Sequence, residues 1–131
     1  MKTDTVKNFL IKAEHDLKSA ELIIKSQPDY TDTITFHCQQ TIEKVLKAFL
    51  TFHKVKIKSN HDILFLLEEC KKIDTGFKNF SFDLVSDINE IGMSVRYDDI
   101  ENDPKQKEAF LYLELAREIF EFVNLKLSSS E

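Results

Sequence analysis

Residues 31–53, TDTITFHCQQTIEKVLKAFLTFH, have the pattern of one long amphipathic helix. At about 1.5 Å per residue this helix would be roughly 35 Å long. Gln40, Glu43, Lys44 and Lys47 are spaced to share one of its faces. Apolar residues recur at three- and four-residue spacing, which places them in a stripe along another side; they are Ile34, Cys38, Ile42, Val45, Leu46, Phe49 and Leu50.

Four further segments show helical periodicity, at about residues 4–26, 61–72, 81–96 and 104–127. Pro28 cannot continue the first of them, and Pro104 suits the first position of the last one. We therefore expect an all-α fold, a five-helix up-and-down bundle with mainly antiparallel neighbours. A single domain would span residues 1–131, with residues 127–131 as a frayed tail.

The segments between the helices are expected to be loops. Residues 54–58 alternate between lysine and apolar residues, but a lone short strand has nothing to pair with. Residues 74–83 contain three phenylalanines, so this loop should fold back onto the bundle. Ser59 or Asn60 is the expected cap of the third helix.

Composition supports a helical domain and excludes several classes of protein. The 131 residues include only two glycines and two prolines, too few for a turn-rich β-sandwich or barrel, and no Gly-rich phosphate loop is present. The net charge of −5 offers no overall basic surface, so nucleic-acid binding is not expected. No apolar run approaches the ~20 residues that span a bilayer.

Cys38 and Cys70 lie within apolar helical patterns, where cysteine usually behaves as a small buried hydrophobe. We expect both to be reduced thiols. Residues 1–4 lead straight into an amphipathic segment without the apolar core of a signal peptide. The sequence therefore favours a cytoplasmic protein.

The last helix, about residues 104–127, carries two adjacent apolar stripes. A helix that is apolar nearly all round is buried on most sides. Either this helix is central, or one stripe meets a second chain. We expect a homodimer, with an interface formed by Leu115, Ile119 and Phe122.

Four pieces of the chain, in order, resemble HEPN domains (higher eukaryotes and prokaryotes nucleotide-binding). Residues 36–50, FHCQQTIEKVLKAFL, resemble the family's second helix, and residues 13–24, AEHDLKSAELII, its first. Residues 61–70, HDILFLLEEC, resemble the His-headed third helix, and residues 94–100, SVRYDDI, the Arg-Tyr turn that follows the fourth. The resemblance implies a five-helix bundle, often dimeric. It also implies frequent pairing with a nucleotidyltransferase, in toxin–antitoxin-like modules or as a fused domain.

Many HEPN members are metal-independent ribonucleases, whose motif is an arginine with a histidine four to six residues after it. The matching arginine here is Arg96, but no histidine follows His61 anywhere in the sequence. Since the imidazole is the group that moves protons near neutral pH, we expect no standard ribonuclease activity and assign no catalytic residue. The alternative is a divergent ribonuclease that uses Arg96 with His61 or His37 of the dimer.

The resemblance instead favours a binding site for a nucleotide or a nucleotidyltransferase-type partner. Its candidate residues are Gln40, Glu43, Lys47, Arg96 and Tyr97. A guanidinium fork suits phosphates and carboxylates alike. The alternatives are a solvated face on the second helix and a structural ion pair from Arg96 to Glu43 or Asp98.

Other polar residues give no sign of a metal site or cofactor. The four histidines are scattered, without the spacing of zinc ligands. The acidic residues 98–103 lack the glycine and closing glutamate of an EF-hand loop, so a solvated loop is expected. Lys54, Lys56 and Lys58 form a small basic spot that we interpret as a solubilising loop.

Overall fold

The computed structural model describes residues 2–57, 62–93 and 100–129 of the chain. Within these ranges it contains five α-helices, a short 3-10 helix and no strand, which confirms the expected all-α class. The helices are α1 (Asp4–Ser26), α2 (Thr31–Phe52), α3 (Ile63–Ile73), α4 (Phe82–Met93) and α5 (Gln106–Ser129), and the 3-10 helix η1 (Thr75–Asn79) follows α3 in the chain.

Helix α3 begins later than expected, because Asp62 is its cap. Oδ1 of Asp62 accepts hydrogen bonds from the backbone N–H groups of Leu64 and Phe65 at 3.0 and 3.2 Å. These bonds satisfy two of the free N–H groups at the start of the helix. The prediction of Ser59 or Asn60 as the cap is therefore wrong.

Helix α5 also begins later than expected. Its first residue is Gln106, so Pro104 precedes the helix instead of starting it. Lys105 directly precedes the helix, and its backbone N–H donates a hydrogen bond to Oε1 of Glu108 at 2.9 Å. At the other end α5 continues to Ser129, so the helix takes in residues that were expected to fray.

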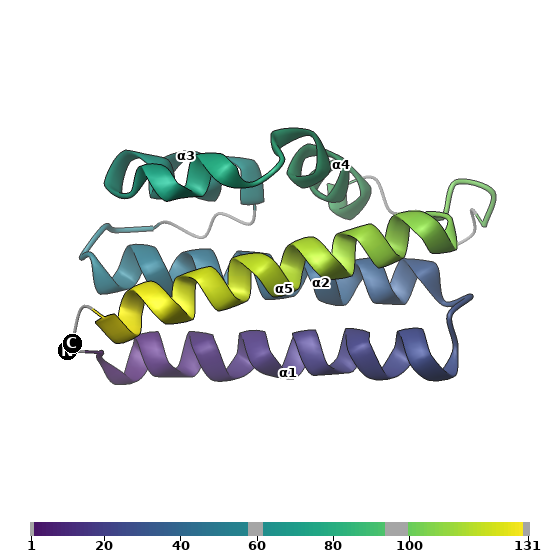
Figure 1. Cartoon of the computed structure of the whole chain (residues 1–131), viewed down its shortest axis with the longest axis horizontal. Coiled ribbons are helices and arrows are strands. Elements are labelled where there is room, and N and C mark those ends of the chain that lie inside the picture. The colour runs from purple at the N-terminus through teal and green to yellow at the C-terminus, as the bar shows by residue number, and fades with distance from the viewer. Residues whose placement is uncertain (1, 58–61, 94–99, 130–131) are drawn as a thin grey trace.

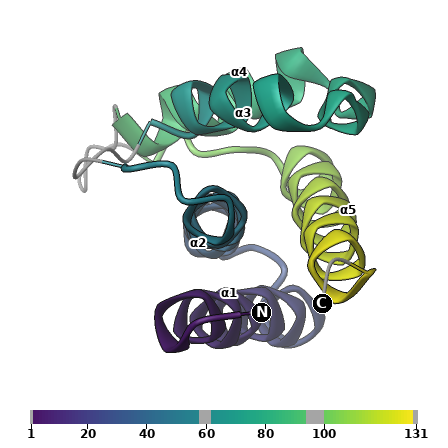
Figure 2. The same ribbon diagram turned by 90° about the vertical axis from the view of Figure 1, so that its left-hand side faces the viewer.

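Helix α2 lies at the centre of the bundle. It packs against α1, α3, α4 and α5, and most of its residues are buried. Viewed along the bundle, α1 lies on one side of α2, α5 on another, and α3 and α4 form a layer above (Figure 2). Helix α1 runs antiparallel to α2 and α5, but α2 and α5 run in the same direction (Figure 1). The expectation of antiparallel neighbours therefore holds for α1 and not for the α2–α5 pair.

The apolar segment between α3 and α4 folds back onto the core, as its phenylalanines predicted. Phe77 of η1 is fully buried, with its ring centroid 4.8 Å from those of Phe49 and Phe122. Phe80 packs edge-on against Phe122 at 5.3 Å. A Cβ on Gly76 would lie 2.8 Å from the ring of Phe122, so this close approach requires glycine. Aromatic packing thus fixes η1 between α2 and α5.

The expected dimer stripe on α5 packs within the chain itself. Ile119 is fully buried and Leu115 nearly so, while Phe122 packs against Phe77 and Phe80. Side chains already covered by their own chain are not a surface for a second one. The prediction that Leu115, Ile119 and Phe122 form an interface is therefore corrected: Leu115 and Ile119 belong to the core, and Phe122 is partly buried and packs against it. Self-association by another surface stays a prediction.

A buried amide joins the layer of α3 and α4. Oδ1 of Asn89 in α4 accepts a hydrogen bond from the backbone N–H of Ile63 at the start of α3, at 3.1 Å.

None of the helices in the described ranges is both long and apolar enough to cross a membrane.

Candidate binding surface on helix α2

One narrow strip of α2 is left uncovered by the other helices. Its residues recur every three or four positions, so they lie on one side of the helix. All of them are exposed or partly exposed, whereas most of the rest of the helix is buried. We call this the α2 strip; it consists of Thr33, Phe36, His37, Gln40, Lys44, Lys47 and Thr51.

An ion pair lies along one edge of the α2 strip. Nζ of Lys47 is 2.9 Å from Oε2 of Glu43, one turn earlier in the same helix. The two side chains are only 12% and 7% exposed. Burying charges costs several kcal/mol per ion before pairing offsets it. The buried pair is therefore weak evidence for added stability, and we treat its two residues as candidates for binding.

A second charged group lies along the opposite edge, where α2 meets α1. Asp16 of α1 accepts a hydrogen bond from Nζ of Lys44, and its other carboxylate oxygen is 2.9 Å from Nδ1 of His37. The carboxylate is mostly covered by its neighbours, and His37 and Lys44 are partly so. Asp16 therefore fixes the orientation of two side chains of the α2 strip.

The structure brings together three of the five residues predicted for the binding site. Gln40, Glu43 and Lys47 share one face of α2, and α4 packs against the same helix. Arg96 and Tyr97 lie outside the described residues, as does His61. The possible ion pair from Arg96 to Glu43 or Asp98 therefore falls outside them too.

The group around Asp16 was missed by sequence reasoning. Lys44 was expected on the polar face and His37 was considered only for the divergent ribonuclease, so neither was expected to contact Asp16. Its partner Asp16 is 21 residues away in another helix. The only local signal is that Asp16 directly precedes Leu17 of the apolar stripe of α1, at the edge of the packed face.

The two cysteines are buried and free, as expected. Burial raises the pKa of the Cys38 thiol to about 12, against a smaller opposing effect of Arg117. Burial also raises the pKa of Cys70, whose Sγ contacts the carbonyl oxygen of Leu46. In the described ranges, no three His, Cys, Asp or Glu side chains lie close enough together to hold a metal ion.

Comparison with known proteins agrees with this architecture. The family model described as "HEPN domain" matches residues 6–126. The chain belongs to the HEPN family. Its fold is similar to that of an archaeal HEPN homologue known from a crystal structure, with a TM-score of 0.66 and 23% sequence identity. The similarity covers 96% of this chain and 98% of that one, while no match was found among curated proteins.

The α2 strip therefore lies within the part of the chain that the HEPN model matches. The four sequence pieces that resemble the family all fall within this range. At this level of identity, the likeness to the archaeal homologue establishes the shared helical fold. What this HEPN chain binds depends on its own surface residues.

Proposed function

We propose that this HEPN chain is a non-catalytic binding module that contacts a nucleotidyltransferase-type partner, in a toxin–antitoxin-like pair. The observation that carries the proposal is the α2 strip. There both lysines are held by carboxylates, Lys44 by Asp16 and Lys47 by Glu43. Phe36, which is 54% exposed, lies on the same strip. An exposed aromatic ring beside ordered polar groups is typical of protein interfaces.

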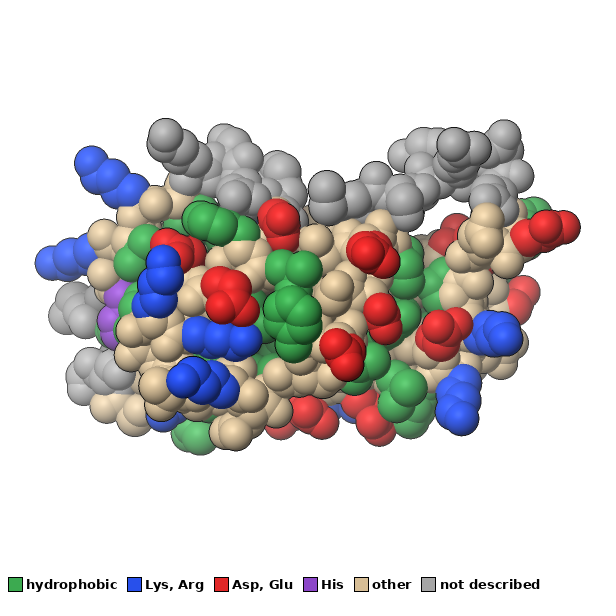
Figure 3. Space-filling view, turned by 90° about the horizontal axis from the view of Figure 1, so that it is seen from above, with side chains coloured by type: hydrophobic (Ala, Val, Ile, Leu, Met, Phe, Trp, Pro, Cys, Tyr) green, Lys and Arg blue, Asp and Glu red, His purple; other side chains and the backbone are tan. Residues whose placement is uncertain are grey.

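A protein partner is better supported than a nucleotide. A triphosphate needs cations that are not already neutralised, and each lysine of the α2 strip has an acidic neighbour. Arg96 is the candidate cation for the nucleotide alternative. Seen from the side of α3 and α4, acidic side chains lie among the basic ones at both ends of the visible face, and no continuous basic stripe runs along its described surface (Figure 3). Nucleic-acid binding rests on a basic surface that neutralises phosphates, so we favour a protein partner for this chain.

The proposal is tested with a nucleotidyltransferase encoded by the same genome. The two purified proteins are mixed at micromolar concentration, and the mass of the complex is measured by size exclusion with light scattering. We expect a complex, and we expect Phe36→Ala to weaken it about tenfold, because interface aromatics commonly contribute more than 1 kcal/mol. Phe110→Ala is the matched control, since that ring is 53% exposed but lies on α5.

The absence of a complex at micromolar concentration would overturn the protein-partner proposal, as would equal binding by both variants. The nucleotide alternative has its own test. Thermal unfolding is measured against a panel of nucleotides, and a ligand at ~100 times its dissociation constant should stabilise the protein by about 2.7 kcal/mol. A shift that Arg96→Ala removes would assign a phosphate site to Arg96.

One observation favours the second candidate, a divergent ribonuclease. The ring of His37 is held at Nδ1 by Asp16, the arrangement that orients a general base. The test is cleavage of single-stranded RNA by the purified chain, with and without a partner. This candidate requires that His37→Asn and Arg96→Ala each abolish cleavage. No cleavage under either condition would exclude it.

A further inference from the structure

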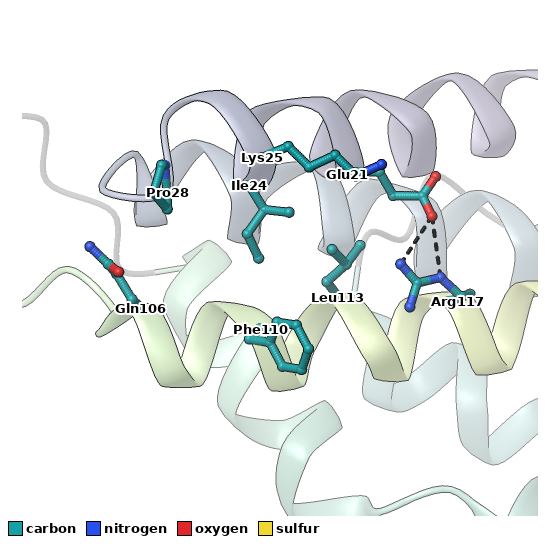
Figure 4. A pocket seen from close by; sticks show the side chains of 8 residues that line it. All are labelled: Glu21, Ile24, Lys25, Pro28, Gln106, Phe110, Leu113 and Arg117. Atoms are coloured by element: carbon teal, nitrogen blue, oxygen red, sulfur yellow. Dashed lines mark hydrogen bonds and ion pairs between the residues drawn. The ribbon is translucent and has the colours of Figure 1, made fainter.

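A groove lies between α1 and α5, near the turn that connects α1 with α2. Helix α5 comes close to α1 near the two termini of the chain and diverges from it toward the other end (Figure 1). The groove has a volume of about 500 Å³, within the range of small-molecule sites. Side chains of both helices line it, with Pro28 of the turn at one end (Figure 4).

One end of the groove is charged. Arg117 of α5 donates two hydrogen bonds to Oε2 of Glu21 in α1, from Nε at 3.2 Å and from Nη2 at 3.0 Å. Among the described residues, Nη1 of Arg117 has no hydrogen-bond partner, and Lys25 forms no ion pair. The Lys25 side chain extends toward the same end (Figure 4). The lining residues thus carry two cations and one carboxylate, an excess of one positive charge, and Nζ of Lys18 outside the groove lies 3.7 Å from Oε1 of Glu21.

The rest of the groove is apolar. Ile24 of α1 and Leu113 of α5 line its walls, and the ring of Phe110 lies beside them (Figure 4). Phe110 is 53% exposed although it is a large apolar side chain. A ligand that covers this ring would remove apolar surface from water, which is the main favourable term in binding small apolar groups.

We infer that this groove binds a small carboxylic acid with an apolar body, such as an arylalkanoic acid. Its carboxylate would accept hydrogen bonds from the free edge of Arg117 and from Lys25. Its apolar body would lie against Ile24, Leu113 and Phe110. This site is separate from the α2 strip and does not depend on the function proposed for it.

The charges select the carboxylate over other small groups. An amine would be repelled by Arg117 and Lys25, because Glu21 is the one carboxylate among the residues that line the groove and Arg117 already pairs with it. A dianionic phosphate would meet the fixed charge of Glu21, which already occupies one edge of the guanidinium. A single carboxylate matches both the excess charge of one and the planar fork of arginine.

The test compares three probes with one apolar body and different charges: 3-phenylpropionate, 3-phenylpropanol and 3-phenylpropylamine. Binding is followed by chemical-shift changes of backbone amides in the ¹⁵N-labelled chain. For a ligand of this size in an open groove we expect a dissociation constant on the order of 1 mM for the acid. The acid should bind about tenfold more tightly than the alcohol, and the amine should bind least.

Variants separate the charged end from the apolar walls. Arg117→Gln should remove the preference for the acid over the alcohol. Phe110→Ala should weaken the binding of the acid and of the alcohol to a similar degree. Glu21→Gln should increase the affinity for the acid, because the substitution frees the guanidinium of Arg117 and raises the excess positive charge from one to two. A merely structural Glu21–Arg117 pair would give no such gain. Phe36→Ala is the control, an equally exposed ring outside the groove.

Equal binding of acid and alcohol would overturn the inference. Chemical-shift changes confined to residues outside α1 and α5 would also overturn it. The same holds if the backbone amides show no saturable chemical-shift change at millimolar concentrations of the acid. A lower affinity of the Glu21→Gln variant for the acid would also contradict the inference. Circular dichroism of each variant checks that the helices are retained, and the substituted positions are all at least partly exposed.

Discussion

Asp74 connects two parts of the chain that are far apart in sequence. Its Oδ1 accepts a hydrogen bond from the backbone N–H of Gly76 at 2.8 Å, and its Oδ2 lies 3.2 Å from Nζ of Lys126 near the end of α5. The hydrogen bond from Gly76 and the ion pair with Lys126 hold the pKa of Asp74 below its usual range, against the opposing effect of burial. The ionised carboxylate therefore stabilises the start of η1.

Asp74→Ala should lower the free energy of unfolding by about 1 kcal/mol at neutral pH, the usual cost of losing a capping side chain. The folded pKa is below the unfolded value of ~3.9, so the contribution of the carboxylate is complete above that value. It is lost as the pH falls through the folded pKa. Urea unfolding at neutral pH and below about pH 3 should show the difference from wild type shrinking in acid.

The control for this prediction is Asp29→Ala, because Asp29 is exposed on the turn between α1 and α2. It should change the free energy of unfolding by no more than about 0.5 kcal/mol at either pH. A stability loss in Asp74→Ala that is the same at both pH values would show that the charge of Asp74 does not contribute.

The buried thiols make a second prediction at this scale. The raised pKa values mean that Cys38 and Cys70 stay protonated at neutral pH, and the thiolate is the reactive form. A disulfide reagent such as Ellman's reagent should therefore detect no thiol in the native protein and two in urea. Rapid reaction of either cysteine in the native protein would contradict this burial.

Single residues also show where sequence reasoning stops. The thiols were predicted to be buried because their neighbours at helical spacing are apolar, and spacing is readable from one sequence. The contact between Asp16 and His37 depends on how α1 and α2 pack against one another. The packing of the whole core determines how each helix is rotated relative to its neighbour. This rotation cannot be predicted from the residue pattern of a single helix.

At the scale of elements, α2 was predicted well and α5 was misread. The α2 pattern correctly predicted the helix, its buried side and its polar face. It did so because the apolar and polar residues of this segment separate onto two sides of one helix. In α5 the second apolar stripe was assigned to another chain. Leu115 and Ile119 are buried in the core instead, and Phe122 packs against Phe77 and Phe80, which belong to a segment with no helical periodicity of its own.

Ile119→Glu should therefore unfold the chain or destabilise it by more than about 3 kcal/mol, because a charge would be buried without a partner. The measurement is urea unfolding followed by circular dichroism. The control is Leu125→Glu, since Leu125 lies on the same helix and is 70% exposed. A well-folded Ile119→Glu protein with a changed mass by light scattering would restore this stripe as an interface.

For the molecule as a whole, helix α1 separates two surfaces. Asp16 faces the α2 strip, where it contacts His37 and Lys44. Glu21 faces α5, where it contacts Arg117. Five positions apart, these two carboxylates point about 140° away from one another around the helix. The proposed partner surface and the proposed acid-binding groove therefore lie on different flanks of one rigid helix.

This geometry predicts that the two surfaces act independently. Distant sites that share no contacts usually combine additively, within about 0.5 kcal/mol. The double variant Phe36→Ala/Phe110→Ala should therefore lose as much partner affinity as Phe36→Ala alone, and as much acid affinity as Phe110→Ala alone. Both affinities are measured on the three variants and on wild type. A change of partner affinity on adding 3-phenylpropionate would instead show that α1 couples the surfaces, since linkage requires the effect to be mutual.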